Sequence, residues 1–127
     1  MKIIIDSFSE APIYIQIADQ IERSILTGET KSGEPLPSIR ALANDLGVSV
    51  ITTKRVYETL EAKGLIITAP QRGSFVNDIS SDELSVMIRR EIASRSRALI
   101  SYAAAFGINS SECTEIFIRE VSNDAEA

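Results

Sequence analysis

Short polar and basic side chains follow one another between Ser49 and Arg55. If this stretch is helical, hydroxyl groups lie at its start and two cations follow within a turn. Hydroxyls and cations of this kind bind phosphate oxygens and the major-groove edges of bases. The candidate contact residues of the segment are Ser49, Val50, Thr52, Thr53, Lys54 and Arg55. Val50 and the neighbouring Ile51 are apolar, so they either face a thymine methyl group or pack into the preceding turn.

Two further groups of residues extend this candidate contact surface. Ser38 caps a predicted helix, and Arg40 lies in its first turn, where it either binds phosphate or bases or remains a solvated surface arginine. Gln71, Arg72 and Gly73 occupy a predicted hairpin turn. A cation there either enters a minor groove or contacts the nucleic-acid backbone, or it is simply solvated.

The elements that position these residues can be predicted from periodicity and breakers. An apolar residue at every fourth position, with Pro12 at the start and Gly28 after the end, predicts a helix over 12–26. Two further helices are predicted from Ser38 to Gly47 and from Ser49 to Gly64. Their separation by a short glycine-containing turn is typical of a helix-turn-helix.

A β-hairpin is predicted directly after these helices. The β-rich segments 65–68 and 74–76 flank a turn that contains proline and glycine. The predicted fold is therefore mainly α with a small β-hairpin. It comprises a winged helix-turn-helix domain over 1–77 and a two-helix tail over 78–127. The first residues, 1–6, predict a β-strand or an ordered arm.

The tail contains two predicted helices that begin at capping boxes. Ser80 with Glu83 begins a long helix that Gly107 ends, and Asn109 with Glu112 begins another, whose end we expect to fray from residue 123. An apolar stripe of this length exceeds the partner surface that the tail offers, which favours a homodimer. The alternative is that the stripe packs on its own winged domain. The predicted dimer residues are Leu84, Ile88, Ile92, Leu99, Ala103, Phe106 and Phe117.

Charge and composition exclude several classes of protein. The net charge is −5, but residues 38–73 carry five basic and three acidic residues, and residues 78–127 carry five basic and nine acidic ones. The chain has no histidine and one cysteine, Cys113, for which a buried thiol is more plausible than a redox role. We therefore expect no metal site, no cofactor and no enzymatic activity. The lack of a signal peptide or a long apolar run predicts a cytoplasmic protein without a membrane span.

The middle of the chain resembles the DNA-binding domain of the GntR family of bacterial regulators. The resemblance extends over about residues 11–76 and rests on PIYIQI at 12–17, GEPLPSIRALA at 33–43, LGVS at 46–49, VYETLEAKGLI at 56–66 and GSFV at 73–76. It implies DNA contacts by Arg40, Ser49, Thr52, Lys54, Arg72 and Gly73. Two departures from the family's pattern, Val50 and the wing sequence Pro70-Gln71-Arg72, affect the expected operator sequence and not the fold.

The short tail is similar to that of the YtrA subfamily, in which it serves dimerisation. This resemblance implies a homodimeric regulator, a repressor by expectation, on a pseudo-palindromic operator of double-stranded DNA. A small-molecule effector is left open by the sequence. The competing hypothesis is a winged-helix module that binds proteins and has lost DNA binding, which the overall acidity and Val50 favour.

Overall fold

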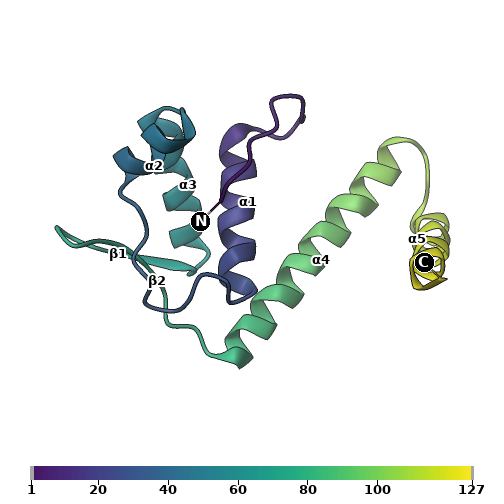
Figure 1. Ribbon diagram of the computed structural model, residues 1–127. Helices are drawn as coiled ribbons and strands as arrows, with labels where there is room; N and C mark the ends of the chain where they lie inside the picture. Colours follow the sequence, from purple (N-terminus) through teal and green to yellow (C-terminus); the bar gives the residue numbers. More distant parts are fainter. Residues whose placement is uncertain (1, 127) are drawn as a thin grey trace. The chain divides into compact units, whose positions relative to one another are not determined.

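The computed structural model describes residues 2–126. Within them the elements are α1 (Ile13–Leu26), α2 (Ile39–Leu46), α3 (Val50–Ala62), β1 (Ile66–Ala69), β2 (Gly73–Val76), α4 (Ser81–Ala105) and α5 (Ser110–Glu126) (Figure 1). The predicted mainly helical fold with one small hairpin is confirmed. The chain forms two compact units, and the first extends to Leu84 and so includes the first turn of α4. The structural boundary thus lies later than the predicted one at residue 77.

Local side-chain caps define the helix-turn-helix. The Ser38 hydroxyl accepts a hydrogen bond from the Ala41 amide at 3.1 Å, and the Ser49 hydroxyl accepts one from the Thr52 amide at 3.0 Å. Both serines satisfy amides that a helix start leaves without a backbone partner. Between the two helices Gly47 has φ of 67°, a left-handed conformation that favours glycine. These contacts confirm the predicted helix starts and the predicted turn.

The core of the first unit forms where α3 packs against α1, α2 and β1. Ile17 and Ile21 of α1 and Val56 and Leu60 of α3 are almost completely buried. Burial of such a side chain contributes about 1.5–3 kcal/mol, so these contacts fix the position of α3. Lys63, directly after the C-terminal end of α3, forms an ion pair with α1. Its Nζ lies 3.1 Å from Glu22 Oε2, and the Glu22 side chain is nearly buried.

Strands β1 and β2 form an antiparallel hairpin whose register pairs Ile66 with Val76 and Ala69 with Gly73. The segment before α2 lies along β2, because the Leu36 amide donates to the Ser74 carbonyl oxygen and the Val76 amide donates to the Glu34 carbonyl oxygen, both at 2.9 Å. This pairing connects the base of the wing to the helix-turn-helix.

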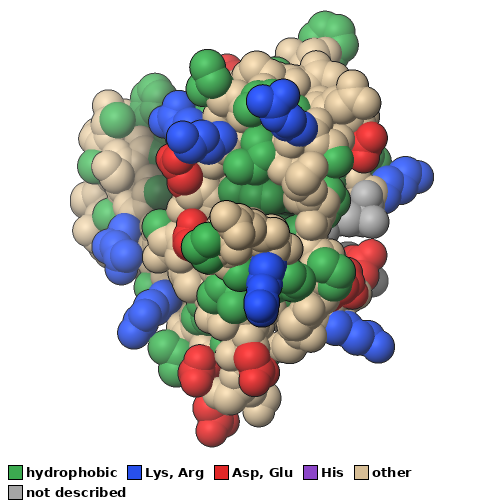
Figure 2. Space-filling model, turned by 90° about the vertical axis from the view of Figure 1, so that its left-hand side faces the viewer, with side chains coloured by type: hydrophobic (Ala, Val, Ile, Leu, Met, Phe, Trp, Pro, Cys, Tyr) green, Lys and Arg blue, Asp and Glu red, His purple; other side chains and the backbone are tan. Residues whose placement is uncertain are grey.

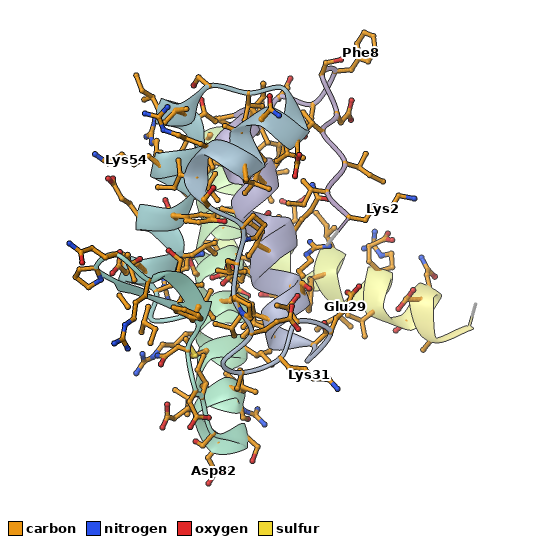
Figure 3. All side chains as sticks on the ribbon, turned by 60° about the vertical axis from the view of Figure 1, so that its left-hand side comes forward. Lys2, Phe8, Glu29, Lys31, Lys54 and Asp82 are labelled. Atoms are coloured by element: carbon orange, nitrogen blue, oxygen red, sulfur yellow. The ribbon has the colours of Figure 1, made fainter. Side chains whose placement is uncertain are left out.

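The N-terminal segment is an ordered arm and not a strand over the described residues 2–11. Two glutamines of α1 hold it by hydrogen bonds to its backbone. Ile4 donates its amide to Gln20 Oε1 at 2.9 Å, and Asp6 donates its amide to Gln16 Oε1 at 2.8 Å. Each glutamine also donates its Nε2 back to the carbonyl oxygen of the same arm residue. At the turn of the arm, Phe8 points away from the protein (Figure 3).

The second unit contains the remainder of α4 and the whole of α5. The predicted caps of both helices are present: the Glu83 amide donates to the Ser80 hydroxyl at 3.2 Å where α4 begins in the first unit, and the Glu112 amide donates to Asn109 Oδ1 at 2.9 Å where α5 begins. Helix α5 continues to Glu126, and the expected fraying from residue 123 stays a prediction. Cys113 is buried, as predicted. None of the helices described combines the length and the apolar character needed to cross a membrane.

Candidate nucleic-acid interface

Helix α3 has one buried and one exposed face. Thr53, Val56, Tyr57 and Leu60 are buried in the domain. The opposite side carries the exposed residues Ile51, Lys54, Arg55 and Glu58. The positions 51, 54, 55 and 58 follow the i, i+3, i+4, i+7 spacing of a single helical face. The side chain of Lys54 extends away from the helix into solvent (Figure 3).

The hydroxyl groups of Ser49 and Thr52 at the start of α3 are hydrogen-bonded to each other. Ser49 Oγ donates to Thr52 Oγ1 at 2.8 Å while it accepts from the Thr52 amide. The Ser49 hydroxyl hydrogen is therefore engaged within the helix cap. The Thr52 hydroxyl can still donate its own hydrogen to an acceptor outside the protein. Thr52 is thus the better placed of the two to donate to a phosphate or a base.

The two apolar residues at this end of α3 are exposed. Val50 is 46% exposed and Ile51 is 80% exposed. The sequence left open whether Val50 and Ile51 pack into the preceding turn, and their exposure shows that they do not. For Ile51, this leaves the other alternative from the sequence, an outward position from which it can face a thymine methyl group.

The cations of α3 have different surroundings. Lys54 Nζ lies 3.9 Å from Glu58 Oε1, and both side chains are mostly exposed. Such a pair contributes little and leaves the lysine free to exchange its partner. The guanidinium carbon of Arg55 lies 3.8 Å from the ring centroid of Tyr14 on α1. Arg55 is therefore held against α1 by a cation–π contact that the sequence analysis did not anticipate.

Tyr57 connects α3 to the segment before α2. Its hydroxyl donates to the Pro37 carbonyl oxygen at 2.6 Å, and only 4% of the residue is exposed. Burial raises the pKa of Tyr57 to about 12. The hydrogen bond fixes the backbone directly before Ser38 and Arg40, and so places the start of α2 relative to α3.

Arg40 and the wing residues lie on the surface as predicted. Arg40 is exposed in the first turn of α2, next to the capping Ser38. Gln71, Arg72 and Gly73 are exposed at the hairpin turn, where Gln71 has φ of 65°. A non-glycine residue therefore takes the left-handed position in this wing. Figure 2 shows basic side chains spread over this side of the protein, with apolar atoms between them.

One predicted contact residue of α3 is excluded by the structure. Thr53 is completely buried, and its hydroxyl donates to the Ser49 carbonyl oxygen at 3.2 Å. The back-bond satisfies the hydroxyl inside the core, so this threonine is a packing residue. The prediction that Thr53 contacts DNA rested only on the polar character of its side chain.

The predicted dimer residues separate into two groups. Exposed apolar side chains occur at Ile88, Ile92, Leu99, Phe106 and Phe117. Ala103 is buried at the turn between α4 and α5, where its carbonyl oxygen accepts from the Phe106 and Ile108 amides. Leu84 is half-buried and lines a small cavity of the first unit with Val76 and Ile79. Ala103 is therefore an intrachain packing residue, whereas Leu84 contributes to packing in the first unit and its place in a dimer stays a prediction.

A groove of about 490 Å³ lies between the end of α4 and the start of α5. Its walls are almost entirely apolar, and the aromatic rings of Tyr102 and Phe106 pack at 5.1 Å between centroids. Tyr102 and Ile116 also line the groove, although neither was among the predicted dimer residues. In the described part of the chain no cluster of acidic or cysteine residues could hold a metal ion.

Comparison with known proteins gives consistent matches. The family model of bacterial regulatory proteins, gntR family, matches residues 13–76. The HTH-type transcriptional repressor YtrA of Bacillus subtilis (strain 168) is 32% identical over 122 residues, which cover 96% of this chain and 93% of that protein.

Solved structures show the same arrangement of elements. YtrA from Sulfolobus acidocaldarius, a GntR-family transcription factor, is 36% identical with a TM-score of 0.58, over 95% of this chain and 97% of that chain. AraR(DBD) in complex with operator ORR3 is 25% identical with a TM-score of 0.51, over 60% of this chain and 92% of that chain. About three fifths of this chain is thus similar in structure to a domain solved in complex with its operator.

Proposed function

Because the chain belongs to the GntR family of DNA-binding transcription regulators, we propose that it is a homodimeric repressor that binds a pseudo-palindromic operator. Its relatives are transcription regulators and not enzymes, so the function to be explained is sequence-specific binding. A repressor of this kind acts in the cytoplasm, where its DNA lies.

The observation that carries the proposal is the exposed face of α3. The first two turns present a free hydroxyl hydrogen on Thr52 and cations at Lys54 and Arg55. A recognition helix contacts base edges with its N-terminal residues, and an α-helix fits the major groove. Nothing described in the first unit covers this end of α3, so a duplex can approach it.

The neighbouring elements supply the backbone contacts in this proposal. Arg40, in the first turn of α2, binds phosphate on one side of the recognition helix. Arg72, with Gln71 and Gly73 at the wing, contacts the backbone or the minor groove on the other. Ser38 and Ser49 orient the helix starts through their caps and bring backbone amides towards phosphate. Thr53 takes no part.

The acidic net charge does not oppose this assignment. Phosphate contacts are local, and the segment 38–73 has two more basic than acidic residues, from five and three. Operator binding by AraR(DBD) is a property of that protein, but its similarity supports the same use of this domain.

The tail supports the homodimer. Several large isoleucine, leucine and phenylalanine side chains on α4 and α5 are exposed, and a group of exposed apolar side chains of this kind is typical of an interaction surface. We assign this surface, with Ile88, Ile92, Leu99, Phe106 and Phe117, to a second copy of the chain. Two copies related by a twofold axis would place two recognition helices on two half-sites.

Fluorescence anisotropy with the upstream DNA of the regulator's own gene tests the proposal. Binding should weaken steeply with salt, because displaced counterions accompany each phosphate contact. Arg40→Ala and Lys54→Ala should each cost about 1–3 kcal/mol of binding free energy without lowering thermal stability. Arg23→Ala, an exposed arginine in the last turn of α1, is the matched control and should bind normally. Salt-insensitive binding, or unchanged affinity in both variants, would favour the protein-binding module.

A further inference from the structure

Ile51 is the most exposed large apolar side chain of the helix-turn-helix. It is 80% exposed, at the second position of α3, and makes almost no contribution to the core. A β-branched residue also has no advantage at an exposed helical position. The fold therefore does not explain why this position is apolar.

The surroundings of Ile51 indicate what it contacts. Lys54 and Arg55 lie three and four positions later on the same exposed face, so a phosphate backbone that binds them passes one turn from Ile51. The N-terminal turn of a recognition helix lies deeper in the major groove than the turns that follow. On the base edges of that groove the C5-methyl group of thymine is the apolar feature.

We infer that Ile51 is a specificity-determining residue that selects a thymine methyl group in each half-site of the operator. This assignment rests on the proposed function and adds a chemical requirement to it. Thr52 donates a hydrogen bond to a neighbouring acceptor, while Ile51 supplies an apolar contact that excludes water from the methyl group. A cytosine or a uracil at that position lacks the methyl group and binds less tightly.

Uracil substitution isolates this contact, because deoxyuridine pairs like thymidine and lacks only the methyl group. The probe is a duplex selected by the protein from a randomised pool, and each thymine of the selected half-site is replaced in turn. Removal of one buried methyl group corresponds to about a fourfold loss of affinity per half-site. The wild type should show this loss at one thymine position, and the Ile51→Ala variant should show no difference between thymine and uracil there.

Two variants serve as controls. Ile4→Ala removes an exposed isoleucine from the N-terminal arm and should keep the full sensitivity to uracil. Val50→Ala tests the other apolar residue of the same turn. If the sensitivity survives in Ile51→Ala and disappears in Val50→Ala, or if the wild type is insensitive at every thymine, the assignment of Ile51 is overturned while salt-dependent DNA binding stands. If the pool yields no bound duplex, the proposed function itself fails.

Discussion

Replacement of Tyr57 by phenylalanine removes a single hydroxyl from the contact between α3 and the segment before α2. The ring is retained, so the packing of this almost fully buried residue is unchanged. The Pro37 carbonyl oxygen loses the donor that lies 2.6 Å away. Because Pro37 is exposed and water can replace the donor, we expect the free energy of unfolding at pH 7 to fall by about 1 kcal/mol.

The effect of Tyr57→Phe on the free energy of unfolding should depend on pH. Burial raises the pKa of Tyr57 to about 12 from the ordinary value of 10.0. The folded protein therefore holds this proton more tightly than the unfolded chain does. The contribution to stability is fully present below pH 10 and is lost as the pH rises towards 12, by about 2.7 kcal/mol in total. Phenylalanine has no such proton, so the stabilities of the two proteins should become equal between about pH 10.5 and pH 11, where the lost contribution reaches the ~1 kcal/mol by which the wild type is more stable at pH 7.

Urea unfolding followed by circular dichroism, at intervals from pH 7 to pH 12, measures this difference. The two proteins differ only in this hydroxyl, so all other groups are common to both sides of the comparison. Tyr102→Phe is the matched control, because it removes a hydroxyl from a tyrosine that is exposed in the tail. A stability difference between wild type and Tyr57→Phe that stays constant from pH 8 to pH 12 would refute the buried, hydrogen-bonded position of this hydroxyl.

Three further substitutions examine other contacts. Phe106→Glu places a charge on the exposed apolar surface of the tail and should weaken the proposed dimer at least about tenfold; sedimentation velocity that finds an unchanged mass would count against this surface. Tyr14→Leu and Arg55→Gln should show a coupling of about 0.5–1 kcal/mol in a double-mutant cycle of unfolding, and additive effects would mean that the cation–π contact is absent in solution. Lys63→Met should destabilise the protein by about 1 kcal/mol more than Glu22→Gln, because it leaves a nearly buried carboxylate without its cation; equal losses in thermal unfolding would contradict that geometry.

Much of the first unit could be predicted from the sequence, because its helix ends are determined locally. Ser38 and Ser49 cap helices with their own hydroxyls, and Gly47 takes a left-handed conformation that a turn requires. Signals of this kind act within four residues and do not depend on the rest of the fold. The hairpin could be predicted for the same reason, although a glutamine, Gln71, has a positive φ at its turn in addition to Gly73.

Burial was harder to predict than secondary structure. Thr53 has a polar side chain on a predicted contact helix, yet it is buried because its hydroxyl is satisfied by the Ser49 carbonyl oxygen. Ala103 has the spacing of the apolar stripe but lies against the turn between α4 and α5. Arg55 and Tyr14 are 41 positions apart in the sequence, so no local sequence pattern predicts their contact. Each outcome depends on how helices pack against one another.

The two faces of α3 divide its residues between folding and recognition. Val56, Tyr57 and Leu60 hold the helix in the core, and successive residues are rotated by about 100° around the axis. Their burial therefore determines which side chains face outward, so Ile51 and Lys54 are oriented by residues that have no part in the proposed DNA contacts. Because the outward residues add little to the core, they can be replaced without loss of the fold. In such a domain a change of operator requires a change in the exposed residues alone, and the stability of the winged helix places little restriction on which bases it selects.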